Sequence, residues 1–194
     1  MNKLSYALGM NMAVNLLNSG INDLETESFV KGFTDTMNNT TTSLTPNEAN
    51  QLIEDFFTKK QNEMQNKNID EGKVFLAENK KRPEVYELQS GLQYEILKEG
   101  DGKMPKYTDE VRCHYHGTLI NGTVFDSSIQ RGQPAVFGVN QVIKGWVEAL
   151  QLMNEGSKWR LFIPSELAYG KQGAGNMIEP NSTLIFDVEL LAIV

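Results

Sequence analysis

The sequence predicts an α+β protein in which a helical N-terminal part precedes an antiparallel sheet with one helix packed on it. Three observations carry this prediction. Apolar residues recur at helical spacing up to about residue 80 and at the strand spacing of two after Pro83. Thr45-Pro46 has the chemistry of a helix start, and Asn121-Gly122 has that of a two-residue hairpin turn.

The composition is that of an ordinary globular protein, since 40% of the 194 residues are hydrophobic and 22% are charged. One cysteine excludes an internal disulfide, and a net charge of −7 without a local basic stripe argues against a nucleic-acid partner. No apolar run approaches the roughly 18 residues of a membrane-spanning helix, and no secretory signal is visible at the N-terminus. We therefore expect no membrane partner and a cytoplasmic location, or a periplasmic one if a signal peptide has been removed.

The first two predicted helices are short and amphipathic. One runs from Leu4 to Asn18 and is followed by Gly20, which suits a left-handed cap, and the other carries its apolar stripe from Phe29 to Met37. Such stripes must be buried against something, and so few residues enclose no core of their own. We expect them to be buried in a homodimer; packing of the same helices onto the C-terminal half is the alternative.

A third helix is predicted to begin at Pro46, because Thr45 is a capping residue and Glu48 completes a capping box. No proline follows until residue 83, so this helix can continue to about residue 80, a length of roughly 50 Å. Its middle, residues 61–73, is polar on nearly all sides and contains Gly72. This pattern indicates a solvated connecting helix, and a disordered linker is the alternative. Flexing is expected near Gly72 or Pro83, although a glycine in a long helix can also be simply tolerated.

The C-terminal half shows period-two alternation in four stretches, which predicts half-buried antiparallel strands. The alternating residues are Leu92, Tyr94 and Ile96, then Val111, Cys113 and Tyr115, then Trp159, Leu161 and Ile163, and finally Leu184, Phe186, Val188, Leu190 and Ala192. One helical pattern lies between them, from Trp146 to Met153. We expect three parts: residues 1–45, residues 46–82 as the long helix, and residues 83–194 as the sheet domain.

The usual equipment for breaking covalent bonds is missing. His114 and His116 lie two residues apart on one strand, and two nitrogens are too few for a zinc site. Cys113 is in phase with the buried positions and suits a small core residue better than a nucleophile. The glycines from Gly170 to Gly175 lack the spacing of a phosphate-binding loop. We therefore expect no cofactor and no metal ion.

Aromatic residues gather instead near the turns of the strand half. They are Tyr115, Phe125, Phe137, Trp146, Tyr169 and Phe186. For any one of them taken alone, ordinary core packing is the favoured interpretation. Asp126 distinguishes the group, because a carboxylate directly after Phe125 needs a partner if it is buried, and Arg131 can supply one.

At these residues the sequence resembles the FKBP-type peptidyl-prolyl cis-trans isomerases. The matching segments lie at 111–128, which ends in Val-Phe-Asp-Ser-Ser, at 141–146 (Gln-Val-Ile-Lys-Gly-Trp), at 167–170 (Leu-Ala-Tyr-Gly) and at 183–191. Segments 6–9, 32–33 and 75–79 resemble the helical dimerisation region of bacterial macrophage-infectivity-potentiator-like members. The resemblance implies a five- or six-stranded antiparallel sheet wrapped around one short helix, and a homodimer formed by the N-terminal helices.

The resemblance also implies a pocket that accelerates rotation about X-Pro bonds. Trp146 would be its floor, the backbone N–H of Ile143 and the hydroxyl of Tyr169 would bind substrate carbonyls, and Asp126 would lie at the rim. The catalytic residues so implied are Tyr115, Asp126, Trp146 and Tyr169. The substrate-binding residues so implied are Phe125, Arg131, Phe137, Val142, Ile143, Met177, Ile178 and Phe186.

The implied partners are proline-containing polypeptides, unfolded proteins held by a dimeric chaperone, and macrolide-type inhibitors. A non-catalytic, client-binding chaperone on the same fold is the alternative. The sequence departs from the family pattern at Ala135, where an aromatic residue is frequent, and at Glu179, where Ile-Pro-Pro becomes Ile-Glu-Pro. Negative charge from Glu179 at the pocket rim predicts poorer turnover of peptides that are acidic beside the proline.

Overall fold

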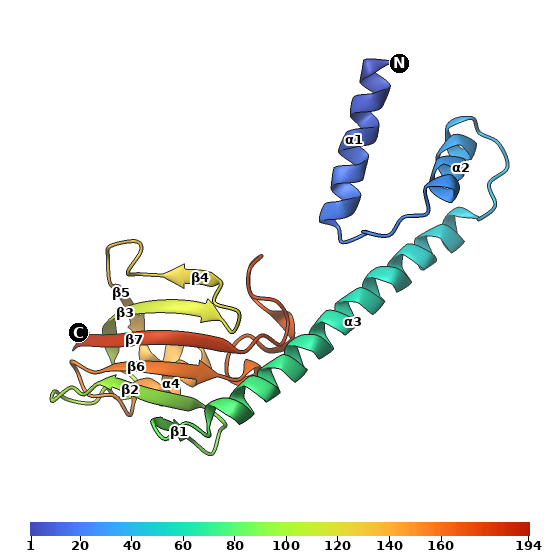
Figure 1. The fold of residues 1–194 in the computed structure, drawn as a ribbon. Helices are drawn as coiled ribbons and strands as arrows, with labels where there is room; N and C mark the ends of the chain where they lie inside the picture. Colours follow the sequence, from blue (N-terminus) through green and yellow to red (C-terminus); the bar gives the residue numbers. More distant parts are fainter. The chain divides into compact units, whose positions relative to one another are not determined.

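The computed structural model describes residues 1–194, which form two compact units, Met1–Phe56 and Phe57–Val194. The first unit contains α1 (Lys3–Asn18), α2 (Thr26–Met37) and the start of α3 (Pro46–Asn79) (Figure 1). The second contains the rest of α3, seven strands and the short helix α4 (Lys144–Leu150). None of these helices has the length and apolar character that crossing a bilayer requires.

Both predicted helix ends in the first unit are confirmed by their cap geometry. Gly20 has a φ of 81°, and its N–H and that of Ile21 donate to Leu17 and Leu16, which closes α1 with a Schellman-type cap. At the start of α3, the Glu48 N–H donates to Thr45 Oγ1 at 3.3 Å, and the Thr45 N–H donates to a Glu48 carboxylate oxygen at 2.8 Å. These reciprocal bonds form the predicted capping box.

The apolar stripes of α1 and α2 are not buried within the chain. Neither helix contains a buried residue, and Leu8 and Phe33 are 58% and 47% exposed. Side chains of this kind contribute stability only when their apolar surface leaves water. The stripes are therefore available to a partner surface.

The sheet of the second unit is antiparallel throughout and has the order β1-β2-β6-β7-β3-β4, with β5 also paired to β3. Its strands are β1 (Val85–Glu87), β2 (Gln93–Lys98), β3 (Glu110–Leu119), β4 (Val124–Ser127), β5 (Ala135–Gly138), β6 (Lys158–Ile163) and β7 (Leu184–Ile193). This confirms the predicted fold class. The sheet has seven strands and not the five or six that the resemblance implied. The strands β1 and β5, of three and four residues, are too short to show alternation in the sequence.

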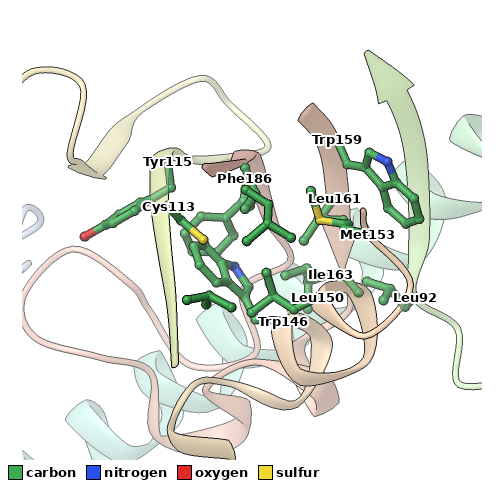
Figure 2. Packing of buried hydrophobic residues seen from close by; sticks show 14 of the residues in the cluster. Leu92, Cys113, Tyr115, Trp146, Leu150, Met153, Trp159, Leu161, Ile163 and Phe186 are labelled. Atoms are coloured by element: carbon green, nitrogen blue, oxygen red, sulfur yellow. The ribbon is translucent and has the colours of Figure 1, made fainter. Parts of the chain in front are cut away.

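The core lies between α4 and one face of the sheet (Figure 2). The predicted alternation is confirmed in β3, β6 and β7, whose inward residues are buried. It fails at Ile96 in β2, which is 36% exposed. The edge strand β1 pairs only with residues 93–95 of β2, so Ile96 has no neighbouring strand on that side.

The C-terminal half of α3 packs on the sheet domain, so the expectation of a solvated connector is wrong for this half. Its less exposed positions include Asn68, Gly72, Phe75 and Asn79, which recur at helical spacing. The Phe75 ring lies 6.0 Å from that of Phe162, and Asn79 Nδ2 donates to Gln93 Oε1 at 2.9 Å. Because small and polar residues make much of this contact, the pattern of apolar residues in the sequence did not predict that this half of α3 is packed.

Gly72 packs tightly against the sheet domain. A Cβ added at this position would overlap Thr183 Oγ1, in the segment that leads into β7. The residue is buried, which fits a packing role better than the predicted flexing point. Glycine is therefore required here by space rather than by backbone freedom.

We expect Gly72→Ala to lower the melting temperature, although alanine is favoured over glycine in exposed helices by about 1 kcal/mol. The added methyl must displace Thr183, a β-branched side chain with little rotamer freedom, and such overpacking costs about 1–3 kcal/mol. Thermal unfolding followed by circular dichroism measures the effect. The same substitution made in a Thr183→Ala background should lower the melting temperature less. An unchanged or raised melting temperature of Gly72→Ala alone would contradict the close contact between Gly72 and Thr183.

Candidate active site

A cavity of about 690 Å³ opens beside α4, and its lining brings together residues that are far apart in the sequence. Eleven of the predicted site residues line it: Tyr115, Phe125, Asp126, Phe137, Val142, Ile143, Trp146, Tyr169, Met177, Ile178 and Phe186. Arg131 lies at the rim through its contact with Asp126. The sequence reasoning missed Gln141, Ala174, Gly175 and Asn176. Gln141 begins the matching segment 141–146 but was not assigned a role there, and the loop that carries the other three has no periodicity to mark them.

Trp146 lies at the base of the cavity and is only 4% exposed. Its ring meets those of Tyr115, Phe137 and Phe186 edge to face, with centroids 5.3 to 5.6 Å apart and interplanar angles of 80° to 84°. Figure 2 shows Trp146 beside Tyr115 and Phe186. Aromatic pairs favour this geometry, so the rings fix one another's orientation.

Two glycines permit this packing. A Cβ on Gly145 would lie 2.6 Å from Ile163 Cγ2, so its absence lets α4 approach β6. A Cβ on Gly117 would lie 2.6 Å from the Phe125 ring and 2.8 Å from the Phe186 ring. The aromatic lining therefore depends on residues without side chains at both positions.

One carboxylate, Asp126, lies at the rim of this apolar cavity. Tyr115 Oη donates to Asp126 Oδ2 at 2.5 Å, and Arg131 Nη2 donates to Tyr115 Oη at 2.7 Å. Arg131 Nη1 also donates to Asp126 Oδ1. The three side chains form a closed network, with the Arg131 guanidinium carbon 5.5 Å from the centre of the Tyr115 ring.

This network sets the charge state of the rim. Burial by itself raises the pKa of Asp126, but the hydrogen bonds from Tyr115 and Arg131 and the Arg131 charge outweigh it and hold the pKa below its usual value of 3.8. Burial, followed by the interaction with Asp126, raises the pKa of Tyr115 above its usual value of 10.0. Burial likewise raises the pKa of Tyr169. Asp126 is therefore ionised near neutral pH, and both phenols are protonated.

Two donors that the resemblance assigns to substrate carbonyls have no partner within the chain. The backbone N–H of Ile143, in the extended residue before α4, makes no hydrogen bond, and neither does the hydroxyl of Tyr169, whose side chain lines the cavity. Polar groups of this kind fix the orientation of a ligand in a mostly apolar pocket. Both can therefore bind acceptors on a bound molecule.

The remaining reactive side chains lie outside this arrangement. Nδ1 of His114 and of His116 lies 3.0 Å from Ser128 Oγ and Ser127 Oγ respectively, on the face of β3 opposite to Tyr115. Cys113 is buried, and burial raises its pKa to about 12. No cluster of three or more His, Cys, Asp or Glu side chains is arranged to hold a metal ion.

Glu179 does not line the cavity, although its chain neighbour Ile178 does. Its carboxylate instead accepts a hydrogen bond from Asn68 Nδ2 on α3 at 3.1 Å. The Glu179 carboxylate thus lies next to the cavity lining without being part of it, and the discrimination against acidic peptides stays a prediction.

The cavity combines an aromatic base with unpartnered hydrogen-bond donors, and comparisons with known proteins identify the class of protein to which it belongs. Residues 101–191 match the family model described as FKBP-type peptidyl-prolyl cis-trans isomerase. Residues 1–96 match the domain described as amino terminal to it.

Relatives of known name match nearly the whole chain. The FKBP-type 22 kDa peptidyl-prolyl cis-trans isomerase of Escherichia coli is 43% identical, over 97% of this chain and 93% of that protein. The outer membrane protein MIP of Legionella longbeachae is 42% identical, over 98% and 84%. The crystal structure of FkpA from Escherichia coli superposes with a TM-score of 0.85 and 35% identity, covering 98% of this chain and 92% of that one.

The chain therefore belongs to the FKBP-type peptidyl-prolyl cis-trans isomerases, and it is an enzyme that acts on proline-containing polypeptides. This confirms the activity that the resemblance implied. The expected cytoplasmic location is not supported, since one of these relatives is named an outer membrane protein.

We expect kcat/KM for a proline-containing peptide to stay constant from about pH 5 to about pH 9, because no group of the network changes charge in that range. Activity should decline as the pH falls through the lowered pKa of Asp126, and again at high pH where Tyr115 and Tyr169 lose their protons. Arg131→Ala removes interactions that lower the pKa of Asp126, while the effect of burial remains. The loss of activity at acid pH should therefore begin at a higher pH in this variant. Stopped-flow assays across a range of pH measure kcat/KM of wild type and of Arg131→Ala. A change in wild-type activity near neutral pH would contradict the charge states assigned to the network.

Proposed function

We propose that the aromatic cavity catalyses isomerisation by binding the twisted X-Pro amide more tightly than the planar one. Rotation must cross a barrier of about 18–20 kcal/mol, because resonance across the C–N bond is lost in the twisted state. No bond breaks, so catalysis requires only stronger binding of that state, with each 1.36 kcal/mol of difference giving about a tenfold rate increase. A twisted amide has a less polar carbonyl, which favours its transfer into an apolar cavity.

The geometry supports a distinct role for each polar group. Trp146 would lie beneath the prolyl ring, while the unpartnered Ile143 N–H and Tyr169 hydroxyl would bind the carbonyls on either side. Asp126 would act at the rim on the rotating carbonyl through its fixed charge. Tyr115 and Arg131 would hold that charge in place.

The remaining lining would shape the cavity around the proline and its neighbours. These residues are Phe125, Phe137, Val142, Met177, Ile178 and Phe186. Their apolar surface supports the proposal, because a dry cavity strengthens the few polar contacts that it contains. Macrolide-type inhibitors would compete with substrate for the same surface.

Loss of either proposed polar contact should reduce catalysis without unfolding the protein. We expect Tyr169→Phe to lower kcat/KM about two- to tenfold, the value of one hydrogen bond, and Asp126→Ala to lower it about tenfold. A coupled assay on an Ala-Leu-Pro-Phe-type peptide measures both. Tyr107→Phe removes a hydroxyl from an exposed tyrosine outside the cavity and is the matched control. Equal rates for wild type, Tyr169→Phe and Asp126→Ala would refute the residue roles.

We further propose that residues 1–45 dimerise and that residues 46–82, whose C-terminal part packs on residues 83–194, connect them to two isomerase domains between which unfolded clients are held. The exposed stripes of α1 and α2, with Leu8 and Phe33 at 58% and 47%, support this proposal. So does the match of residues 1–96 to the N-terminal domain model. Apolar surface on both helices would leave water when two copies associate.

Removal of residues 1–56 should give a monomer with nearly unchanged activity on short peptides but weaker protection of an aggregating protein. The cut falls before Phe57 because the rest of α3 belongs to the isomerase unit. Light scattering reports the mass, and refolding of a proline-limited substrate reports the protection. In the full chain, Phe33→Asp should also favour the monomer, whereas its neighbour Thr34→Asp is the matched control. A dimer that survives the truncation would exclude this interface.

A further inference from the structure

One wall of the cavity is a loop that the sheet does not hold. This wall loop, residues 174–178, contributes a third of the lining residues. It is closed by two backbone bonds of 2.8 and 3.1 Å between Ala174 and Ile178, and the Asn181 N–H donates to the Gly170 carbonyl at its base. These bonds fix the shape of the loop itself. Among residues 174–178 only Ile178 is buried, in the core cluster that also contains Trp146, so the rest of the loop depends on other contacts for its position.

Helix α3 contacts this segment directly after its last lining residue, Ile178. Asn68 Nδ2 donates to Glu179 Oε2 at 3.1 Å and to the Pro180 carbonyl at 2.9 Å. A side-chain amide has two N–H donors, so both are used on this one segment. The contact joins residues that are more than a hundred positions apart in the chain.

The helix is itself held in place next to Asn68. One turn further along, Gly72 packs closely against Thr183, and beyond it Phe75 lies 6.0 Å from Phe162. Asn79 then hydrogen-bonds Gln93, whose Nε2 also donates to the Leu76 carbonyl at 3.0 Å. Asn68 is thus carried by an element that is anchored to the sheet domain at several points.

We propose that Asn68 is a positioning residue of the active site, which holds the wall loop against the cavity through Glu179 and Pro180. The proposal deepens the proposed function and rests on it. A loop that leaves its binding position reduces apparent substrate affinity by the fraction of time that it is displaced. Losing this contact therefore raises KM while kcat changes little, because the groups at the rotating bond stay in place.

The first test compares Asn68→Ala and Asn68→Asp with wild type. The alanine variant removes both donors, and the aspartate variant adds a carboxylate opposite Glu179, so KM should rise about threefold and about tenfold respectively. Hydrogen exchange in the segment 170–183 should become faster in both. Asn66→Ala, at an exposed position on the same helix, is the matched control and should change neither quantity.

The second test is rescue. In Asn68→Asp/Glu179→Gln the donor and acceptor exchange places, which restores the amide–carboxylate pair but not the bond to the Pro180 carbonyl, so KM should fall below that of Asn68→Asp without reaching the wild-type value. A merely structural role would lower the melting temperature without a separate change in KM. The inference is overturned if the Asn68 variants match wild type in KM and exchange, or if the double variant shows no recovery, while Asp126→Ala remains impaired. Full activity of Asp126→Ala and Tyr169→Phe would instead refute the proposed function.

Discussion

The site depends on the edge-to-face packing of Trp146 against Tyr115, Phe137 and Phe186. This one contact joins α4 to strands β3, β5 and β7, so it closes the core and forms the base of the cavity together (Figure 2). The packing leaves the indole N–H of Trp146 buried without a hydrogen-bond partner, which is unfavourable. An unsatisfied donor costs about 1–3 kcal/mol, which the burial of several large rings offsets. Stability and binding surface therefore come from the same side chains.

The charged network at the rim is the counterpart of that apolar base. An ionised carboxylate in an apolar cavity is costly unless its charge is matched, and Asp126 is matched by Arg131 and by the Tyr115 hydroxyl. Tyr115 takes part in both systems, since its ring packs on Trp146 and its hydroxyl binds Asp126. The orientation of the charge is thus coupled to the packing of the base. For a reaction that twists an amide and transfers no proton, a charge held in a fixed place is sufficient.

The sequence was informative where a short segment specifies its own structure. The capping box at Thr45 and the alternation in β3 and β7 are local patterns, and they placed α3 and the inward-facing Tyr115 and Phe186 correctly. The wall loop was only partly foreseen, because Gly175 and Asn176 line the cavity through the course of the backbone. Ile96 was misplaced because its burial depends on how far the edge strand β1 extends, which no local pattern encodes.

The packing of α3 shows why a polar helix face can still specify a contact. Burial of apolar surface is non-directional, so an apolar stripe would hold the helix to the domain without defining its position along the axis. Hydrogen bonds have narrow geometry, and the side chains of Asn68 and Asn79 each reach defined acceptors. A slip of one turn would move these amides by about 5.4 Å and break both sets of bonds. Gly72 adds a steric limit, because only one register places a residue without a side chain opposite Thr183. The polar face therefore sets the register of the helix, and through Asn68 it also sets where the wall loop lies.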